Sequence, residues 1–378
     1  MAIKPLDFYN QLASHEVDFF TGVPDSLLKD FCLCIDNFIP NTHNIITANE
    51  GSAVALAAGY FLATKKIPLV YMQNSGLGNA VNPLLSLCDS NVYSIPMILM
   101  IGWRGEPGVN DEPQHKKQGE VQIELLKTLG LAYELISGND DQFAQKIANA
   151  VKLSKTENKP TVLLIKKGTF KKYLTKTKKI DSLLMKREVA LDVILDNINN
   201  DDLVISTTGK TSREIYEIRE NKAQSHKQDF LTVGSMGHCS SIALGIALGE
   251  PIRKVFCIDG DGAMLMHLGS LTSIAELKPK NFYHILLNNE SHESVGGQKT
   301  AAKNLDLFEI VKSIGYKNIF KVESLSELKN TFTEFTNSKG PSFLEVKIKI
   351  GSRNNLGRPK EAPIKNKELF MNFIERPS

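Results

Sequence analysis

The sequence has 378 residues, of which 42% are hydrophobic and 23% are charged, as in ordinary globular proteins. At roughly 100–200 residues per domain, this length predicts two or three domains. The 45 basic and 42 acidic residues nearly balance, which argues against a nucleic-acid or membrane-surface partner. No apolar run reaches about 18 residues. The N-terminal segment lacks the basic and apolar regions of a signal peptide, so we expect a cytoplasmic protein.

The five cysteines agree with a reducing location. They are odd in number and form no CxxC pair or zinc-binding spacing. Cys257 lies in an apolar run and is predicted to be a buried small hydrophobic residue. None of the five has the sequence pattern of a nucleophile.

Apolar runs typical of strands alternate with helical patterns along the first half of the chain. Strands are expected near 43–50, 67–76, 94–103 and 161–168, and helices over 50–64, 78–89 and 121–131. A polar loop is expected over 104–120. The strand runs are continuous Val, Ile, Leu and Met without polar alternation, which is typical of a parallel sheet covered by helices on both faces.

A basic segment at 166–179 is interpreted as part of a solvated linker, after which the alternation restarts. Further strands are expected near 202–209, 230–237, 254–262, 282–289, 318–324 and 342–350, separated by helical patterns. We infer two doubly wound α/β domains of similar size, with no third, central domain. The expected boundaries are a first domain over 1–170, a linker over 171–185, a second domain over 186–350 and a C-terminal tail over 351–378.

The most specific motif lies in the second half. One strand ends at Gly260-Asp261-Gly262 and the next ends at Asn288-Asn289. Because the carboxyl ends of parallel strands meet at one edge of a sheet, Asp261 and Asn289 should converge. Carboxylate, amide and backbone oxygens suit Mg²⁺ or Ca²⁺. The glycines allow close backbone approach, and the following helix N-terminus favours phosphate oxygens.

Competing motifs fit this part of the chain poorly. A dinucleotide fingerprint needs a third glycine where Leu265 stands, which weakens the hypothesis of a nicotinamide-dependent dehydrogenase. A calcium loop starting at Asp259 needs Gly and Glu where Met264 and Ser270 stand. A P-loop over 204–211 lacks its first glycine.

The Gly-Asp-Gly and Asn-Asn pair resembles the thiamine-diphosphate motif of the 2-oxo-acid decarboxylase superfamily. The resemblance implies that Asp261, Asn289 and the backbone carbonyl of Ser291 hold a Mg²⁺ ion bound to the diphosphate of the cofactor. Other residues expected beside the cofactor in this half are Gly209, Ser235, Met236, Gly260 and Gly262. Met236 fits the apolar residue that the family places under the cofactor, and its alternative is an ordinary core methionine.

The first half contains a second match to this family. In TANEGSAVALAAGY, Glu50 opens an Ala/Gly-rich helix after a strand, where the family places the glutamate that hydrogen-bonds the aminopyrimidine ring. The alternative is a surface carboxylate in the first turn of a helix, where Glu is favourable. Asp25 and His115 fall where simple members carry an active-site aspartate and histidine. Their alternatives are a helix N-cap for Asp25 and a solvent-exposed loop histidine for His115.

The missing central domain narrows the resemblance to compact two-domain members, and segments 71–84, 102–120 and 351–359 carry it. It implies decarboxylation of a 2-oxo acid that bears a second anionic group, a phosphonate or a sulfonate. Cations must then hold the substrate, and arginine binds such groups through paired hydrogen bonds. The candidates are Arg104, Lys117, Arg353 and Arg358, and for each the alternative is a solvated charge.

The family resemblance also implies a homo-oligomer, at least a dimer, in which subunits share active sites. A hypothesis of another class is a non-catalytic partner that binds the cofactor. The intact Glu50 argues against it.

Overall fold

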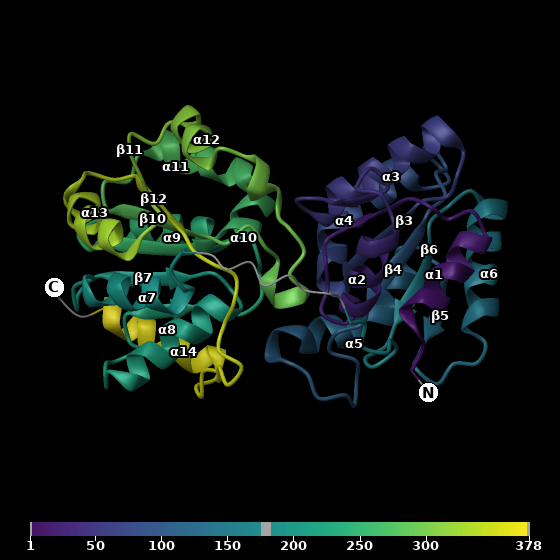
Figure 1. Cartoon of the computed structure of the whole chain (residues 1–378), viewed down its shortest axis with the longest axis horizontal. Helices are drawn as coiled ribbons and strands as arrows, with labels where there is room; N and C mark the ends of the chain where they lie inside the picture. Colours follow the sequence, from purple (N-terminus) through teal and green to yellow (C-terminus); the bar gives the residue numbers. More distant parts are fainter. Residues whose placement is uncertain (1, 175–182, 376–378) are drawn as a thin grey trace. The chain divides into compact units, whose positions relative to one another are not determined.

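The computed structural model describes residues 2–174 and 183–375, and it divides the chain into two compact units (Figure 1). Unit 1 comprises Met1–Lys178 with Val295–Gln298, and unit 2 comprises Lys179–Ser294 with Lys299–Ser378. Most of the expected linker, residues 175–182, lies outside the described residues. The expected domain boundaries therefore stay predictions. None of the helices described is long and apolar enough to cross a membrane.

Unit 1 is built around a six-stranded parallel sheet with the order β2-β1-β3-β4-β6-β5. Its strands are β1 (Phe20–Gly22), β2 (Asn44–Ile46), β3 (Leu69–Gln73), β4 (Ile98–Gly102), β5 (Tyr133–Ile136) and β6 (Thr161–Ile165). Its helices are α1 (Pro5–Ser14), α2 (Lys29–Phe38), α3 (Glu50–Thr64), α4 (Leu77–Pro83), α5 (Pro113–Thr128) and α6 (Phe143–Glu157).

Unit 2 repeats this topology. Its six parallel strands have the order β8-β7-β9-β10-β12-β11, which is the unit 1 order with every strand number raised by six. The strands are β7 (Leu203–Ser206), β8 (Asp229–Leu231), β9 (Val255–Gly260), β10 (Phe282–Asn288), β11 (Asn318–Val322) and β12 (Ser342–Lys347). The helices are α7 (Arg187–Asp196), α8 (Lys210–Asn221), α9 (Cys239–Gly249), α10 (Asp261–Met266), α11 (Leu271–Leu277), α12 (Leu307–Ile314), α13 (Leu325–Asn337) and α14 (Pro363–Ile374). The predicted fold class is confirmed.

Helices cover both faces of each sheet because both faces are apolar (Figure 1). In β3, Leu69 and Tyr71 join the core on one face, and Val70 and Met72 join the core on the other. Consecutive strand residues point to opposite faces, so an uninterrupted apolar run fills two cores at once. The carboxyl edge of each sheet is left for polar side chains.

Three local predictions differ from the structure. The polar loop expected over 104–120 becomes helical at Pro113, because Pro is favourable in the first turn and α5 then continues to Thr128. The strand expected over 230–237 ends at Leu231, and the residues after it form turns. The segment after residue 350 is not a plain tail, since it carries α14.

Candidate active site

In unit 1, the short segment that follows β3 organises the polar side chains at the carboxyl edge of the sheet. Gln73 donates through Nε2 to Asp25 Oδ1 at 2.7 Å. Asn74 donates through Nδ2 to the backbone carbonyl of Arg104 at 2.9 Å. Gly76 lies against the carboxylate of Glu50. The turn at the end of β3 thus contacts three predicted site residues: Asp25, Arg104 and Glu50.

Glu50 begins α3 and is 5% exposed, which excludes the alternative of a surface carboxylate. The helix is capped by Asn49, whose side chain accepts from the Ser52 amide, so Glu50 is not needed as a cap. Its Oε2 accepts a hydrogen bond from Asn79 Nδ2 at 2.8 Å. A Cβ at Gly76 would lie 2.2 Å from Glu50 Oε1, so only glycine leaves room for the carboxylate.

Asp25 is fully buried between the ends of β1, β3 and β4. Its oxygens accept from Gln73 and from the Leu27 amide. It does not cap α2, whose N-cap is Leu28, so the helix-cap alternative fails. A Cβ at Gly102 would lie 2.2 Å from Asp25 Oδ2, which makes that glycine part of the site. Burial raises the pKa of Asp25, and the hydrogen bond from Gln73 opposes this shift without cancelling it. The raised pKa makes protonation of Asp25 easier than that of an exposed carboxyl group.

His115 lies in the first turn of α5 and is 8% exposed, so the exposed-loop alternative is wrong. Its Nδ1 lies 3.0 Å from Asp111 Oδ1. Burial lowers the pKa of His115, although Asp111 opposes the shift. The neutral imidazole is therefore favoured.

Asp111 links His115 to Arg104. Arg104 donates through Nε to Asp111 Oδ2 at 2.7 Å and through Nη1 to Ser26 Oγ at 2.6 Å. Burial would raise the pKa of Asp111, but Arg104 and His115 outweigh it and hold the pKa well below its usual range. A chain of contacts thus runs from Ser26, beside Asp25, through Arg104 and Asp111 to His115.

In unit 2, the predicted cofactor residues follow four adjacent strands. Gly209 comes after β7, Ser235 and Met236 after β8, Gly260 to Gly262 after β9, and Asn289 to Ser291 after β10. The sheet order places β8, β7, β9 and β10 side by side, so these residues share one carboxyl edge.

Asp261 and Asn289 are brought together as predicted. Asp261 is 3% exposed, and its Oδ2 accepts from Thr300 Oγ1. Burial raises the pKa of Asp261 to about 6, against hydrogen bonds from Thr300 and from the backbone amides of Asp261 and Asn289. The Oγ of Ser291 is buried without a hydrogen-bond partner among the described residues. A buried carboxylate beside an amide and a hydroxyl lacking a partner fits a hard divalent cation.

The glycines at this edge leave its surface open. Gly209 has a φ of +94° and caps α8, a conformation that favours glycine. A Cβ at Gly260 would meet no atom closer than 3.9 Å, whereas one at Gly262 would lie 3.0 Å from the His292 ring. Met236 is half-buried in a turn between β8 and α9, so it is not the ordinary core methionine of the alternative. It and Ser235 lie near the N-terminus of α9.

The four candidate cations, two in each unit, differ in their surroundings. Arg104 is engaged by Asp111 and Ser26, as described above. Lys117 is 83% exposed on α5 and lies 3.8 Å from Glu120. Arg353 donates to Glu188 at 2.7 Å and also to Glu217. Arg358 belongs to the exposed segment after Gly357. None of the four is assigned to the substrate by geometry.

Four polar residues, three near the carboxyl edge of the unit 1 sheet and one near that of unit 2, were not predicted from the sequence. They are Gln73, Asn79, Asp111 and Glu293. Glu293 accepts from Asn289 Nδ2 at 3.0 Å and is itself held by Arg187 and Lys210. Asp111 stands four residues before His115, but it lies before α5 in a segment that the sequence indicates as a loop, so none of the four left a usable signal.

Comparison with known families agrees with this arrangement. Residues 7–126 match the model described as "Thiamine pyrophosphate enzyme, N-terminal TPP binding domain". Residues 207–346 match "Thiamine pyrophosphate enzyme, C-terminal TPP binding domain". Together with the two repeated sheets, they define a thiamine pyrophosphate enzyme, and its cofactor is thiamine diphosphate.

Similar curated proteins narrow the class. The chain is 33% identical to a phosphonopyruvate decarboxylase of Streptomyces viridochromogenes, over 99% of this chain and 96% of the relative. It is 32% identical to the phosphonopyruvate decarboxylase of Streptomyces hygroscopicus, over 99% and 95%. A sulfopyruvate decarboxylase of Methanosarcina acetivorans is 28% identical, over 85% and 87%. The chain belongs to the family of these phosphonopyruvate decarboxylases.

Proposed function

We propose that this protein decarboxylates 3-phosphonopyruvate to phosphonoacetaldehyde and CO₂, a step in the biosynthesis of phosphonates such as 2-aminoethylphosphonate. The observation that carries the proposal is the identity of 33% to a phosphonopyruvate decarboxylase along 99% of this chain. The reaction breaks the bond between the carboxylate and the keto carbon, and a proton replaces CO₂. Thiamine diphosphate, when bound, supplies the sink for the electron pair released by that cleavage.

Glu50 is the residue we assign to the aminopyrimidine ring of the cofactor. Its carboxylate is buried, its Oε2 is oriented by Asn79, and Gly76 leaves space beside its Oε1. A carboxyl group fixed in this way can exchange a hydrogen bond with a ring nitrogen without first losing side-chain freedom. The test is Glu50→Gln, which should abolish decarboxylation while thiamine diphosphate still binds. Full activity of that variant would overturn the assignment.

Asp25 and His115 are the groups we assign to proton transfer at the substrate. Burial raises the pKa of Asp25 and lowers that of His115, which brings the two groups closer to exchanging protons in the same pH range. A carboxyl group and an imidazole in one polar cluster suit delivery of a proton to the carbon that loses CO₂.

Asp261, Asn289 and the backbone carbonyl of Ser291 are the ligands that we assign to Mg²⁺. All three would offer oxygen atoms, which Mg²⁺ prefers. Glu293 accepts from Asn289 Nδ2, and Asn289 Oδ1 accepts from the Ser291 amide at 3.1 Å, so the side chain is held in place while the oxygen keeps a second lone pair for the metal. Gly209, Ser235, Gly260 and Gly262 would line the diphosphate, and Met236 the rings of the cofactor. Asp261→Ala should remove Mg²⁺-dependent binding of thiamine diphosphate in calorimetry. An unchanged affinity would contradict the metal assignment.

The phosphonate and carboxylate of the substrate need cationic partners. Arg104 already lies within the Asp25–His115 cluster, so we favour it over Lys117, Arg353 and Arg358. Its guanidinium is shared with Asp111, and its remaining hydrogens can be offered to an anion. Arg104→Lys should raise KM for the substrate more than it lowers kcat. An unchanged KM would return the role to the other three.

A substrate panel tests the activity itself. The holoenzyme with Mg²⁺ would be offered phosphonopyruvate, sulfopyruvate and pyruvate, and the aldehyde product would be detected with a coupled reductase. We expect the highest kcat/KM for phosphonopyruvate. A preference for sulfopyruvate would instead support the alternative that the Methanosarcina acetivorans relative suggests. Turnover of none of these acids would favour the non-catalytic alternative.

We further propose that the protein acts as a homo-oligomer, at least a dimer, with active sites shared between subunits. Unit 1 carries Glu50 and unit 2 carries the diphosphate and metal residues, so neither residue set is complete by itself. Mixing inactive Glu50→Gln with inactive Asp261→Ala should restore part of the activity if subunits exchange and share sites. A monomer in analytical ultracentrifugation would contradict the proposal.

A further inference from the structure

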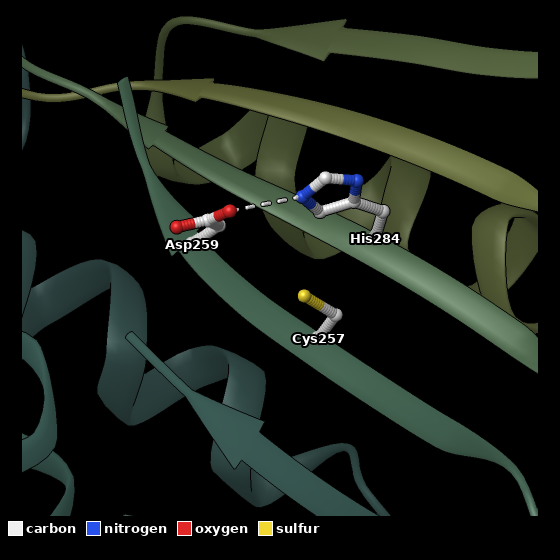
Figure 2. Close-up of side chains that lie close together, drawn as sticks. All are labelled: Cys257, Asp259 and His284. Atoms are coloured by element: carbon white, nitrogen blue, oxygen red, sulfur yellow. Dashed lines mark ion pairs between the residues drawn. The ribbon is translucent and has the colours of Figure 1, made fainter. Parts of the chain in front are cut away.

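Three side chains of unit 2 that have no part in the proposed mechanism lie together inside the sheet: Cys257 and Asp259 on β9 and His284 on β10 (Figure 2). Each is fully buried. In the parallel register, Cys257 lies opposite His284, and Asp259 follows two residues later on the same face. The three ligand atoms lie within 4.8 Å of one another.

The polar atoms of this cluster lack the partners that buried groups normally have. Neither ring nitrogen of His284 has a hydrogen-bond partner in the described part of the chain, and neither does Asp259 Oδ2. The interaction between His284 Nε2 and Asp259 Oδ2 spans 3.6 Å, too far for a hydrogen bond (Figure 2). The other oxygen, Asp259 Oδ1, is occupied by the Gly260 amide at 2.8 Å. Buried polar atoms without partners are costly, so the cluster calls for a bound group.

The donor set identifies the kind of group. A thiolate, an imidazole and a carboxylate are together the ligands of Zn²⁺, whereas Mg²⁺ prefers oxygen alone. Ionised Cys257 and Asp259 with neutral His284 carry two negative charges, and a second thiolate ligand would add a third; one divalent cation offsets two of these charges in the apolar core.

A fourth side chain approaches from the helix that covers this face of the sheet. Cys239 on α9 places its Sγ 3.6 Å from Cys257 Sγ. Two thiolates bound about 2.3 Å from a tetrahedral zinc ion lie roughly 3.8 Å apart, so the spacing of Cys239 and Cys257 suits a shared ion. Cys239 lies outside the set of three residues whose ligand atoms are all within 4.8 Å of one another, so its side chain must move toward the ion to complete the site. The sequence shows no zinc motif because the ligands come from adjacent strands and a separate helix.

We propose that Cys257, Asp259 and His284 bind a structural Zn²⁺ ion, with Cys239 beside them as the fourth ligand. The ion would join β9, β10 and α9 directly behind the Gly260–Gly262 turn. It is separate from the Mg²⁺ ligands, which are oxygen atoms on the carboxyl edge.

Metal content gives the first test. Full-length protein would be produced with zinc in the medium, freed of Mg²⁺ and thiamine diphosphate, and analysed by mass spectrometry of the metal. We expect about one zinc per chain, lost in Cys257→Ser and in His284→Gln. Cys88→Ser changes a buried cysteine of unit 1 and should keep the metal.

Cobalt exchange gives a second test whose main measurement is made on the wild-type protein. Co²⁺ in the wild-type site should produce a thiolate-to-metal absorption band in the near ultraviolet, which the sulfur-free Asp261 site cannot give. The band should survive Cys88→Ser and vanish in Cys257→Ser. Folded wild-type protein that holds no stoichiometric zinc and shows no thiolate band with Co²⁺ overturns the proposal. Neither test uses the substrate, so the outcome is independent of the proposed decarboxylation.

Discussion

Asp111 accepts a hydrogen bond from His115 Nδ1 at 3.0 Å across the start of α5. The carboxylate is kept ionised, because Arg104 and His115 hold its pKa well below the usual range despite its burial. An ionised carboxylate can only accept, so the hydrogen of neutral His115 must reside on Nδ1. The lone pair of Nε2 is then left for chemistry, which makes Asp111 a positioning residue for His115.

Asp111→Asn should therefore impair turnover. The amide can present its NH₂ group to His115 Nδ1 and so reverse the tautomer. We expect kcat to fall about 10- to 100-fold, a part of the 10²–10⁴ that a positioned acid or base contributes. The pH profile of kcat/KM should shift as well. Asp140→Asn is the matched control, because Asp140 is equally buried but pairs with Lys146. An unchanged pH profile in Asp111→Asn would show that the carboxylate does not set the state of His115.

Burial of Asp25 predicts a pH-dependent cost to stability. Its pKa is raised in the folded state, so its contribution to stability is complete below about pH 4 and is lost as the pH rises through the folded pKa. Asn cannot ionise. The melting temperature of Asp25→Asn relative to wild type should therefore increase between pH 4 and pH 8. Each 1 kcal/mol of this cost corresponds to about 2 °C or more in a domain of roughly 150–250 residues.

Asp18 provides a control, because its pKa shifts in the direction opposite to that of Asp25. Burial would raise its pKa, but hydrogen bonds from Lys66 and Tyr60 outweigh burial and lower it. Its contribution to stability is present at neutral pH and lost in acid. The relative melting temperature of Asp18→Asn should fall as the pH rises. Parallel curves for the two variants would contradict the interpretation of Asp25.

The convergence of Asp261 and Asn289 could be predicted from the sequence. It depends only on continuous apolar runs, which indicate parallel strands, and on the rule that carboxyl ends of such strands share an edge. The sequence predicts two α/β domains of similar size, and the structure adds that their strand orders are identical. Burial of Cys257 was predicted correctly for the same reason.

Side-chain partners could not be predicted, because they depend on register and on the path of loops. Arg104 was identified as a cation, but its pairing with Asp111 requires the loop after β4 to fold back. His284 faces Cys257 only in one register of β9 and β10, and a shift of one residue would turn it to the opposite face. Such contacts determine the charge and orientation of the side chains in a site, but they leave no recognisable pattern in a single sequence.

A buried ion pair between α7 and α8 should contribute to the stability of unit 2. Glu214 is 2% exposed and binds Arg187 through two hydrogen bonds, of 2.7 and 2.9 Å. Glu214→Gln leaves Arg187 with less compensation in a buried place, and losses of about 3–5 kcal/mol are typical. We expect the lower end, because Glu293 still pairs with Arg187. Urea unfolding followed by circular dichroism measures the change. The exposed pair of Lys365 with Glu368 supplies the control, and Glu368→Gln should leave the midpoint unchanged.

The approach of Gly76 to Glu50 gives the sharpest test of unit 1. Alanine suits the backbone at Gly76, whose φ is −75°, but its Cβ would lie 2.2 Å from Glu50 Oε1 and must displace the carboxylate. A displacement of about 1 Å can cost 10²-fold, so Gly76→Ala should lower kcat roughly 100-fold while the domain remains folded. Gly78 lies two residues further on, and a Cβ there meets nothing within 4 Å. Gly78→Ala should therefore keep wild-type activity, and its melting temperature should not fall, since alanine favours helix. If Gly76→Ala turned over as fast as Gly78→Ala, the position of the Glu50 carboxylate would not matter for catalysis, and its assignment to the cofactor ring would fail.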